Sequence, residues 1–230
     1  MTTAETGTTG PDPEARGIRL VLVLLLLTVV SGLIDAVSYL GLGHVFTANM
    51  TGNVVVLGFA MAGAPGFSVP HTATSLACFL IGAHIGGRVA TRFKGGSRRT
   101  WARATLGAEA VLVAAAAAVA FAEPHTDGTT DALIGLTAIA MGLRNATVRR
   151  LGVADLTTTI LTMTLTGLAS DDPRAEGPGR RSPRRVGAVV AMLVGAAGGG
   201  LLVRHHGLGI PLLVAAVASA ALAVLASGRD

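Results

Sequence analysis

The sequence predicts an all-α polytopic membrane protein, a bundle of membrane helices built from two similar halves. Of its 230 residues, 51% are hydrophobic and 13% are charged, whereas about 25% of residues are charged in soluble domains. The apolar residues fall into long blocks, such as 20–30 and 210–226, and crossing a bilayer takes about 20 mostly apolar residues. Similar motifs also recur in the two halves at a nearly constant spacing.

The positive charge of the chain does not indicate nucleic-acid binding. The formal net charge is +5, but the arginines stand in short clusters between apolar blocks, and one Trp and one Tyr are too few to stack bases. The single Cys78 lies inside an apolar block, which argues against a disulfide framework or a cysteine metal site. No nucleophile–base pair or pair of carboxylates has the spacing of a hydrolase. We therefore expect no enzyme activity, no metal and no cofactor.

The predicted elements follow a polar tail. Residues 1–17 are rich in Thr, Gly, Pro and acidic residues, which is typical of a disordered segment, here expected in the cytoplasm. Each apolar segment after it is expected to be helical, because a backbone in lipid must satisfy its own hydrogen bonds. These segments cover residues 18–40, 46–63, 71–91, 104–122, 131–148, 156–169, 186–203 and 209–227. The first resembles a signal peptide, but no cleavage site follows it closely, so a retained span is expected.

Matching motifs indicate an internal duplication. GLIDA at 32–36 resembles GLRNA at 142–146, which is an offset of 110 residues. LIGA at 80–83 resembles LVGA at 193–196, an offset of 113 residues. Matches in the same order at nearly the same offset are not expected by chance. Within one membrane domain, 18–227, the expected halves are 18–122 and 123–227.

The charged loops predict the orientation, because cytoplasmic loops carry an excess of Lys and Arg. The stretch 88–103 holds six basic residues and no acidic one, whereas 123–131 holds three acidic residues and neither Lys nor Arg. The first is expected inside and the second outside. Arg144 and the arginines of 149–150 and 174–185 also favour the cytoplasm, although an apolar segment lies between the last two groups.

That intervening segment is short. Its 14 residues, 156–169, would form about 21 Å of helix, less than the roughly 30 Å of the bilayer core, which predicts a re-entrant element. If 46–63 also re-enters, six spans remain, both termini are cytoplasmic, and every Lys and Arg except Arg204 lies inside. Three spans in each half invert the halves, as in many transporters and channels. Seven spans with an external N-terminus stay open, because the 20 residues of 45–64 are long enough to cross.

The densest polar run at membrane depth is FTANMTGN at 46–53. In a helix, side chains four residues apart share a face, which would pair Thr47 with Thr51. The same spacing pairs Asn49 with Asn53. If a half-helix begins here, its free N–H groups suit an anion, although small polar residues also hold membrane helices together. The second half offers further hydroxyl groups, among them Thr158 and Thr162.

Ionisable residues inside the apolar segments are further candidates, because such residues are rare in membranes and mostly functional. Asp35 stands late in the first segment, as a proton or cation site or as an interfacial carboxylate, and Asn145 occupies the equivalent position of the second half. His84 is a candidate proton relay or a core histidine bonded to a neighbouring helix. Glu109 lies near the arginines of 98–103, which predicts an interfacial salt bridge.

These motifs resemble a known family, the YoaK-type bacterial membrane proteins, whose domain of unknown function is numbered 1275. The resemblance covers residues 18–227 and departs from the family pattern at Met163, where Gly is more usual. It implies a multi-pass protein of the bacterial inner (plasma) membrane and no particular activity. The matching residues are 32–36, Tyr39-Leu40, 45–53, 141–146, Thr157-Thr158 and Thr162.

The function that these features favour is a small-solute transporter or channel. Its polar site would lie between 47–53 and 158–166, with Asp35 tuning it. The alternative is a non-catalytic membrane scaffold or accessory subunit, in which the same residues only pack helices. The expected partners are the lipid bilayer and an unidentified small solute, with further copies of the chain as an open alternative and no nucleic acid.

Overall fold

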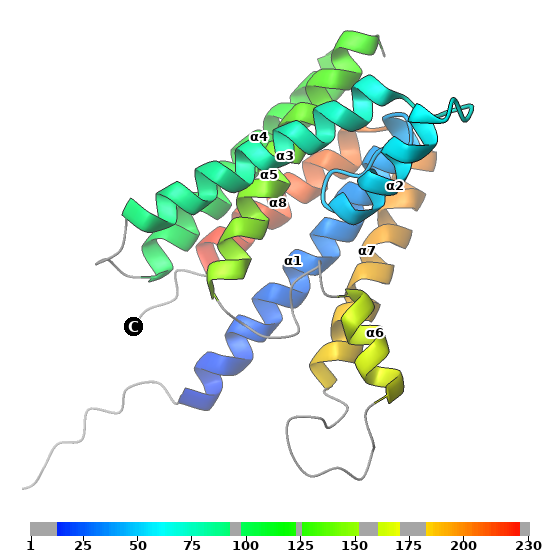
Figure 1. Ribbon diagram of the computed structural model, residues 1–230. Helices are drawn as coiled ribbons and strands as arrows, with labels where there is room; N and C mark the ends of the chain where they lie inside the picture. The colour runs from blue at the N-terminus through cyan, green and yellow to red at the C-terminus, as the bar shows by residue number, and fades with distance from the viewer. Residues whose placement is uncertain (1–12, 93–97, 123–125, 152–160, 171–182, 226–230) are drawn as a thin grey trace, which may run out of the picture.

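The computed structural model of the chain describes residues 13–92, 98–122, 126–151, 161–170 and 183–225. These residues form eight α-helices and no strand, packed as a single bundle (Figure 1). The predicted all-α class is therefore confirmed. The helices are α1 (Pro13–Gly41), α2 (Met50–Met61), α3 (Val69–Arg92), α4 (Arg98–Ala122), α5 (Asp127–Leu151), α6 (Leu161–Ser170), α7 (Pro183–His206) and α8 (Gly209–Leu225).

Four of the described helices are long and apolar enough to cross a membrane. They contain the stretches Val21–Gly41, Val69–Arg92, Thr100–Ala122 and Val186–His206. By contrast, α2 has 12 residues and is therefore about 18 Å long, well short of a roughly 30 Å bilayer core. Non-helical residues before α2 supply much of the length that made 45–64 appear able to cross.

The first helix begins earlier than expected. It starts at Pro13, so the prediction of a disordered tail over 1–17 is wrong for residues 13–17. Proline is favoured at the first helical position, because its φ angle suits a helix and its missing N–H is not needed there. The rest of the predicted tail, 1–12, lies outside the described residues.

Glycines bring α1 and α7 into close contact. Gly32 of α1 packs against the backbone of α7 near Met192 and Ala196, and Gly195 of α7 packs against the carbonyl group of Val29. Such contacts between backbones need residues without a side chain. Further along, Gly199 lies against Leu33, so the two helices run parallel.

A second seam of the same kind joins α3 and α5. Gly142 of α5 packs against the backbone of α3 near Phe79 and Ala83, and Gly82 of α3 packs against the carbonyl group of Ile139. These helices also run parallel, since Gly86 lies against Leu143. The first and second halves of the chain therefore interleave.

The other central helices complete the core. α4 packs along α8, and α5 along α4. The largest hydrophobic cluster takes most of its buried side chains from α1, α4, α5 and α8, among them Ile34, Val113, Ile134 and Leu212. α3 and α7 instead present large exposed apolar side chains, including Leu80, Ile81, Leu193 and Val194. In a membrane, such side chains face lipid.

Replacing Gly195 by Ala is expected to destabilise the bundle. The added Cβ would collide with the carbonyl oxygen of Val29, and overpacking of this kind typically costs about 1–3 kcal/mol. Gly198→Ala in the same helix is the matched control, because a Cβ added at Gly198 would meet no atom within 4 Å. It should be neutral or slightly stabilising, because Ala favours helix by about 1 kcal/mol over Gly. Thermal unfolding in detergent measures both, and equal midpoints would contradict the close packing.

Candidate functional site

The carboxylate of Asp35 binds the chain that enters α2. Asp35 lies near the end of α1 with a relative exposure of 4%. Its Oδ1 accepts hydrogen bonds from the backbone N–H groups of Thr47, Ala48 and Asn49, at 3.1, 2.8 and 3.4 Å. These residues directly precede α2. A negative charge therefore sits where we expected free N–H groups to attract an anion, and the protein itself provides that charge.

The other oxygen of the same carboxylate is unsatisfied. Asp35 Oδ2 is buried and has no hydrogen-bond partner among the described residues, and the same is true of Thr47 Oγ1. Buried polar atoms are nearly always paired, and an unpaired one costs about 1–3 kcal/mol. Two such oxygens in one loop are therefore a candidate binding position.

Asn53 and Ser75 hold the same loop on its other side. Asn53 is fully buried; its Oδ1 accepts from the N–H of Phe46 at 2.8 Å, and its Nδ2 donates to the Phe46 carbonyl at 2.6 Å. Ser75 of α3 donates to that carbonyl at 2.6 Å and accepts from Asn53 Nδ2 at 3.0 Å. Side chains thus replace the helical hydrogen bonds that this stretch lacks.

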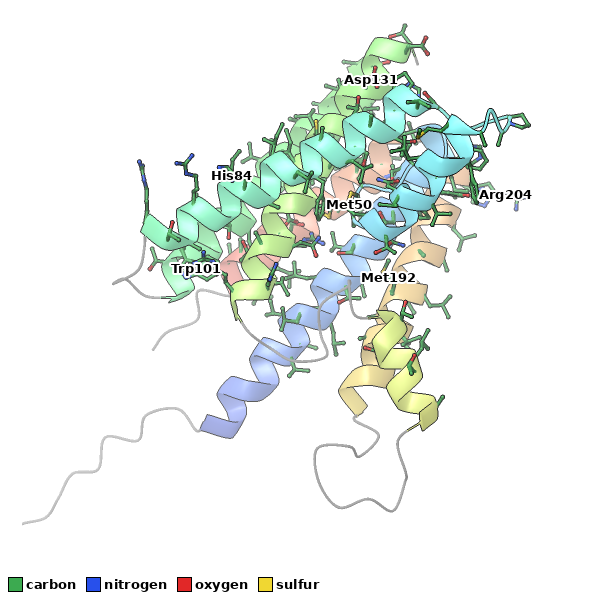
Figure 2. The ribbon with its side chains drawn as sticks, in the orientation of Figure 1. Met50, His84, Trp101, Asp131, Met192 and Arg204 are labelled. Carbon is green, nitrogen blue, oxygen red and sulfur yellow. The ribbon has the colours of Figure 1, made fainter. Side chains whose placement is uncertain are left out.

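Aromatic rings lie one helical turn further along α1. Tyr39 stacks on Phe46 with ring centroids 4.7 Å apart, and its edge meets His44 at 5.3 Å. The His44 Nδ1 is 3.0 Å from the carbonyl oxygen of Gly66. The rings belong to the end of the bundle that carries α2, which is the end of Asp131 and Arg204 in Figure 2, opposite Trp101.

The predicted pairing of residues within 46–53 is wrong. We expected Thr47 to share a helix face with Thr51, and Asn49 with Asn53. The helix begins only at Met50, so Thr47 and Asn49 precede it. Thr47 and Asn53 are buried, whereas Asn49 and Thr51 are exposed. Asn49 caps α2 instead, and its Oδ1 accepts from the N–H of Gly52 at 3.4 Å.

The second-half candidates lie elsewhere. Asn145 donates to the Met141 carbonyl, one turn back in α5, at 2.9 Å. Thr162 is exposed on α6, and Thr158 lies outside the described residues. α2 packs on α3 and α6 on α7, and Figure 1 shows α2 and α6 towards opposite ends of the bundle. The structure therefore does not bring Thr162 to the loop around Asp35.

His84 is also away from this loop. Its side chain is exposed on α3, and its Nε2 lies 3.4 Å from Arg88 Nη1, one turn along the same helix. Figure 2 shows it well separated from Met50, where α2 begins. The interpretation of His84 as a core histidine bonded to a neighbouring helix is wrong, because the side chain faces outwards.

The predicted partner of Glu109 is wrong. Glu109 of α4 is fully buried and pairs with Arg144 of α5, which is 3% exposed. Arg144 Nε donates to Glu109 Oε2 at 2.8 Å, and Nη2 donates to Oε1. Arg144 therefore belongs to the interior of the bundle and not, as the loop-charge argument assumed, to a cytoplasmic loop. Its place inside an apolar segment was the available signal.

Further hydrogen bonds join this ion pair to two more helices. Arg144 Nη1 donates to the Leu27 carbonyl at 2.9 Å and to Ser31 Oγ at 3.0 Å, both in α1. Ser219 of α8 accepts from Arg144 Nη2 at 3.0 Å and donates to Glu109 Oε1 at 2.6 Å. All five N–H donors of a guanidinium thus have acceptors, and one polar cluster connects four helices.

Replacing Asn53 by Leu is expected to destabilise the protein, because it leaves the backbone N–H of Phe46 buried without an acceptor. The expected loss is about 1–3 kcal/mol. Thr51→Ala is the control, since Thr51 is exposed on the same helix and its change should stay within about 0.5 kcal/mol. Thermal unfolding in detergent compares them, and an Asn53→Leu midpoint equal to that of the control would refute the role of this side chain.

Comparison with known proteins identifies the family. Residues 23–225 match the family described as "Protein of unknown function (DUF1275)". The chain is 37% identical over 153 residues to the UPF0700 transmembrane protein YoaK of Bacillus subtilis (strain 168), a match that spans 65% of each chain. No solved structure matches. This relative and the apolar helices support a location in the membrane, and the chain belongs to the DUF1275 family, as its motifs predicted.

Proposed function

We propose that the protein is a multi-pass transporter or channel of the bacterial inner membrane that passes a small solute at Asp35. The carrying observation is the buried Asp35 carboxylate, with one oxygen bound to three N–H groups and the other without a partner among the described residues. Ionisable groups at membrane depth are costly and are mostly retained for function. This site is narrower than the one expected from sequence, since it lies around 35–53 alone.

An inverted duplication supports this proposal. The contacts of Gly32 with Met192 and Ala196 repeat as those of Gly142 with Phe79 and Ala83. Every residue of the first set corresponds to one of the second at the offsets of 110 and 113 found in the sequence. The contact of Gly82 with Ile139 repeats in the same way as that of Gly195 with Val29. Such correspondence is expected if two related halves pack around a common twofold axis.

The direction of the helices favours inversion of the halves. In Figure 1, α1 ascends towards the end that carries α2, whereas α5, its counterpart, descends from that end. With α2 and α6 too short to cross, at 12 and 10 residues, each half contributes three spans. Inverted repeats with broken helices recur in transporters, with the binding site at the broken helices.

Cysteine accessibility tests this topology. On a Cys78→Ser background, a cysteine within 64–68 should label from outside the cell, and one within 171–181 only after the membrane is made permeable. The reason is that both termini and the arginine-rich stretches are expected inside. Labelling of both positions from the same side would rule out the inverted six-span arrangement.

Proteoliposome flux tests the site. Purified protein should accelerate the passage of at least one of protons, sodium, potassium, chloride or glycerol. Asp35→Asn keeps an oxygen that can accept the three N–H groups but removes the charge, so flux should fall roughly tenfold or more, as for the loss of a charged contact of about 1.5–3 kcal/mol. Asn49→Ala should also reduce flux, because Asn49 caps α2.

Thr28→Val is the matched control for these variants. Thr28 is buried in the same helix as Asp35, and its hydroxyl bonds within α1, to the Leu24 carbonyl at 2.9 Å. Its substitution should leave both flux and folding unchanged. Full flux in folded Asp35→Asn protein would sink the site, and wild-type protein that passes none of the five solutes would favour an accessory subunit.

A further inference from the structure

The buried charges of the bundle do not balance. Among the described residues, three charged side chains are buried, namely Asp35, Glu109 and Arg144, at 4%, 0% and 3% exposure. Two of them are acids and one is a base, so the interior would carry one net negative charge if all were ionised. A net charge away from water is very costly, and in practice proteins neutralise it.

Arg144 does not neutralise Asp35. Its N–H groups go to Glu109, Ser219, Ser31 and the Leu27 carbonyl. Within the described part of the chain, Asp35 in turn receives only backbone N–H groups, and its Oδ2 has no partner. One unit of positive charge is therefore missing at this oxygen.

We infer that the missing charge is a proton bound to Asp35 Oδ2, and that the solute handled at this site is a proton. The inference rests on the proposed function, since it names the species at the proposed site. A metal cation needs more oxygen atoms: magnesium binds six and calcium six to eight. The loop offers two unpartnered buried oxygens among the described residues, Asp35 Oδ2 and Thr47 Oγ1. A proton needs only one of them.

The arrangement also makes Arg144 a positioning residue shared by two acids. Ser31, which accepts from Arg144, lies one helical turn before Asp35 on the same side of α1, and Arg144 acts on Asp35 electrostatically. Tyr39, one turn after Asp35, is neutral. If Glu109 takes the proton, Arg144 is free to balance Asp35. The interior is neutral with the proton on either acid, so one proton can exchange between them.

Infrared difference spectroscopy tests the inference directly, because a protonated carboxylic acid has its own carbonyl band. Purified wild-type protein at neutral pH should show one such buried band, and Asp35→Asn should abolish it. Glu109→Gln should abolish it as well, although Asp35 is still present, because the charge of Arg144 then balances Asp35. A purely structural role for Glu109 predicts that the band remains.

The double variant Glu109→Gln/Arg144→Gln completes the test. It restores the single uncompensated acid, so the band should return. Replacing both members of a buried ion pair by neutral residues is also far milder than removing one, which keeps the test readable if Glu109→Gln alone unfolds. Absence of the band in wild-type protein would overturn the inference, as would its absence in the folded double variant or its loss when sodium chloride replaces choline chloride.

These measurements are made in detergent and need no transport. A wild-type band without flux of any solute would therefore refute the proposed function and leave the buried proton in place. Flux that falls in Asp35→Asn, with no band in wild-type protein, would support the site and refute the proton as its ligand.

Discussion

Backbone hydrogen bonding inside a low-dielectric medium is the constraint on which this structure depends. A chain in lipid has no water to satisfy its N–H and C=O groups, and helices solve this for most of the described residues. The stretch between α1 and α2 is the exception, because it is buried without being helical. There, Asp35 accepts three N–H groups, while Asn53 serves both backbone groups of Phe46. The polar residues of this region are therefore required by the break in the helix. Only the second oxygen of Asp35 goes beyond that requirement, which is why it is the part of the loop that suggests a function.

Close packing and charge act at different places in the bundle. The seams of α1 with α7 and of α3 with α5 depend on backbone contact at glycines, which provides dispersion and shape complementarity without polar groups. The middle of the bundle instead joins α1, α4, α5 and α8 through Arg144 and Glu109. A buried ion pair is poor evidence of stability, because desolvation offsets much of the attraction. In this bundle its clearest effect is to set the net charge that Asp35 experiences.

Sequence patterns predicted most of the fold and part of the site. Length, apolar blocks and loop charges identified each helix of the described chain, and the motifs at 32–36 and 142–146 indicated the glycines that form the seams. Periodicity failed at 46–53, because a helical spacing was assumed for residues that precede the helix. It failed again at Glu109, where the arginines nearest in sequence were chosen over Arg144. Both errors have the same origin. Partners that come from separate helices, such as Asp35 with the 47–49 backbone or Arg144 with Ser219, depend on tertiary contacts that no local spacing encodes.

The interleaving of the two halves has a consequence for how the protein is made. α1 leaves the ribosome first, yet the helix that closes its glycine seam is α7, more than a hundred residues later. Until α7 is inserted, the groove around Gly32 has only lipid or the insertion machinery against it. Assembly of this bundle is therefore non-local and slow to complete, and neither half alone contains the partners that its own glycines require. A duplicated gene whose copies fold only together has lost the independence of its ancestral unit, and that dependence keeps the two halves fused.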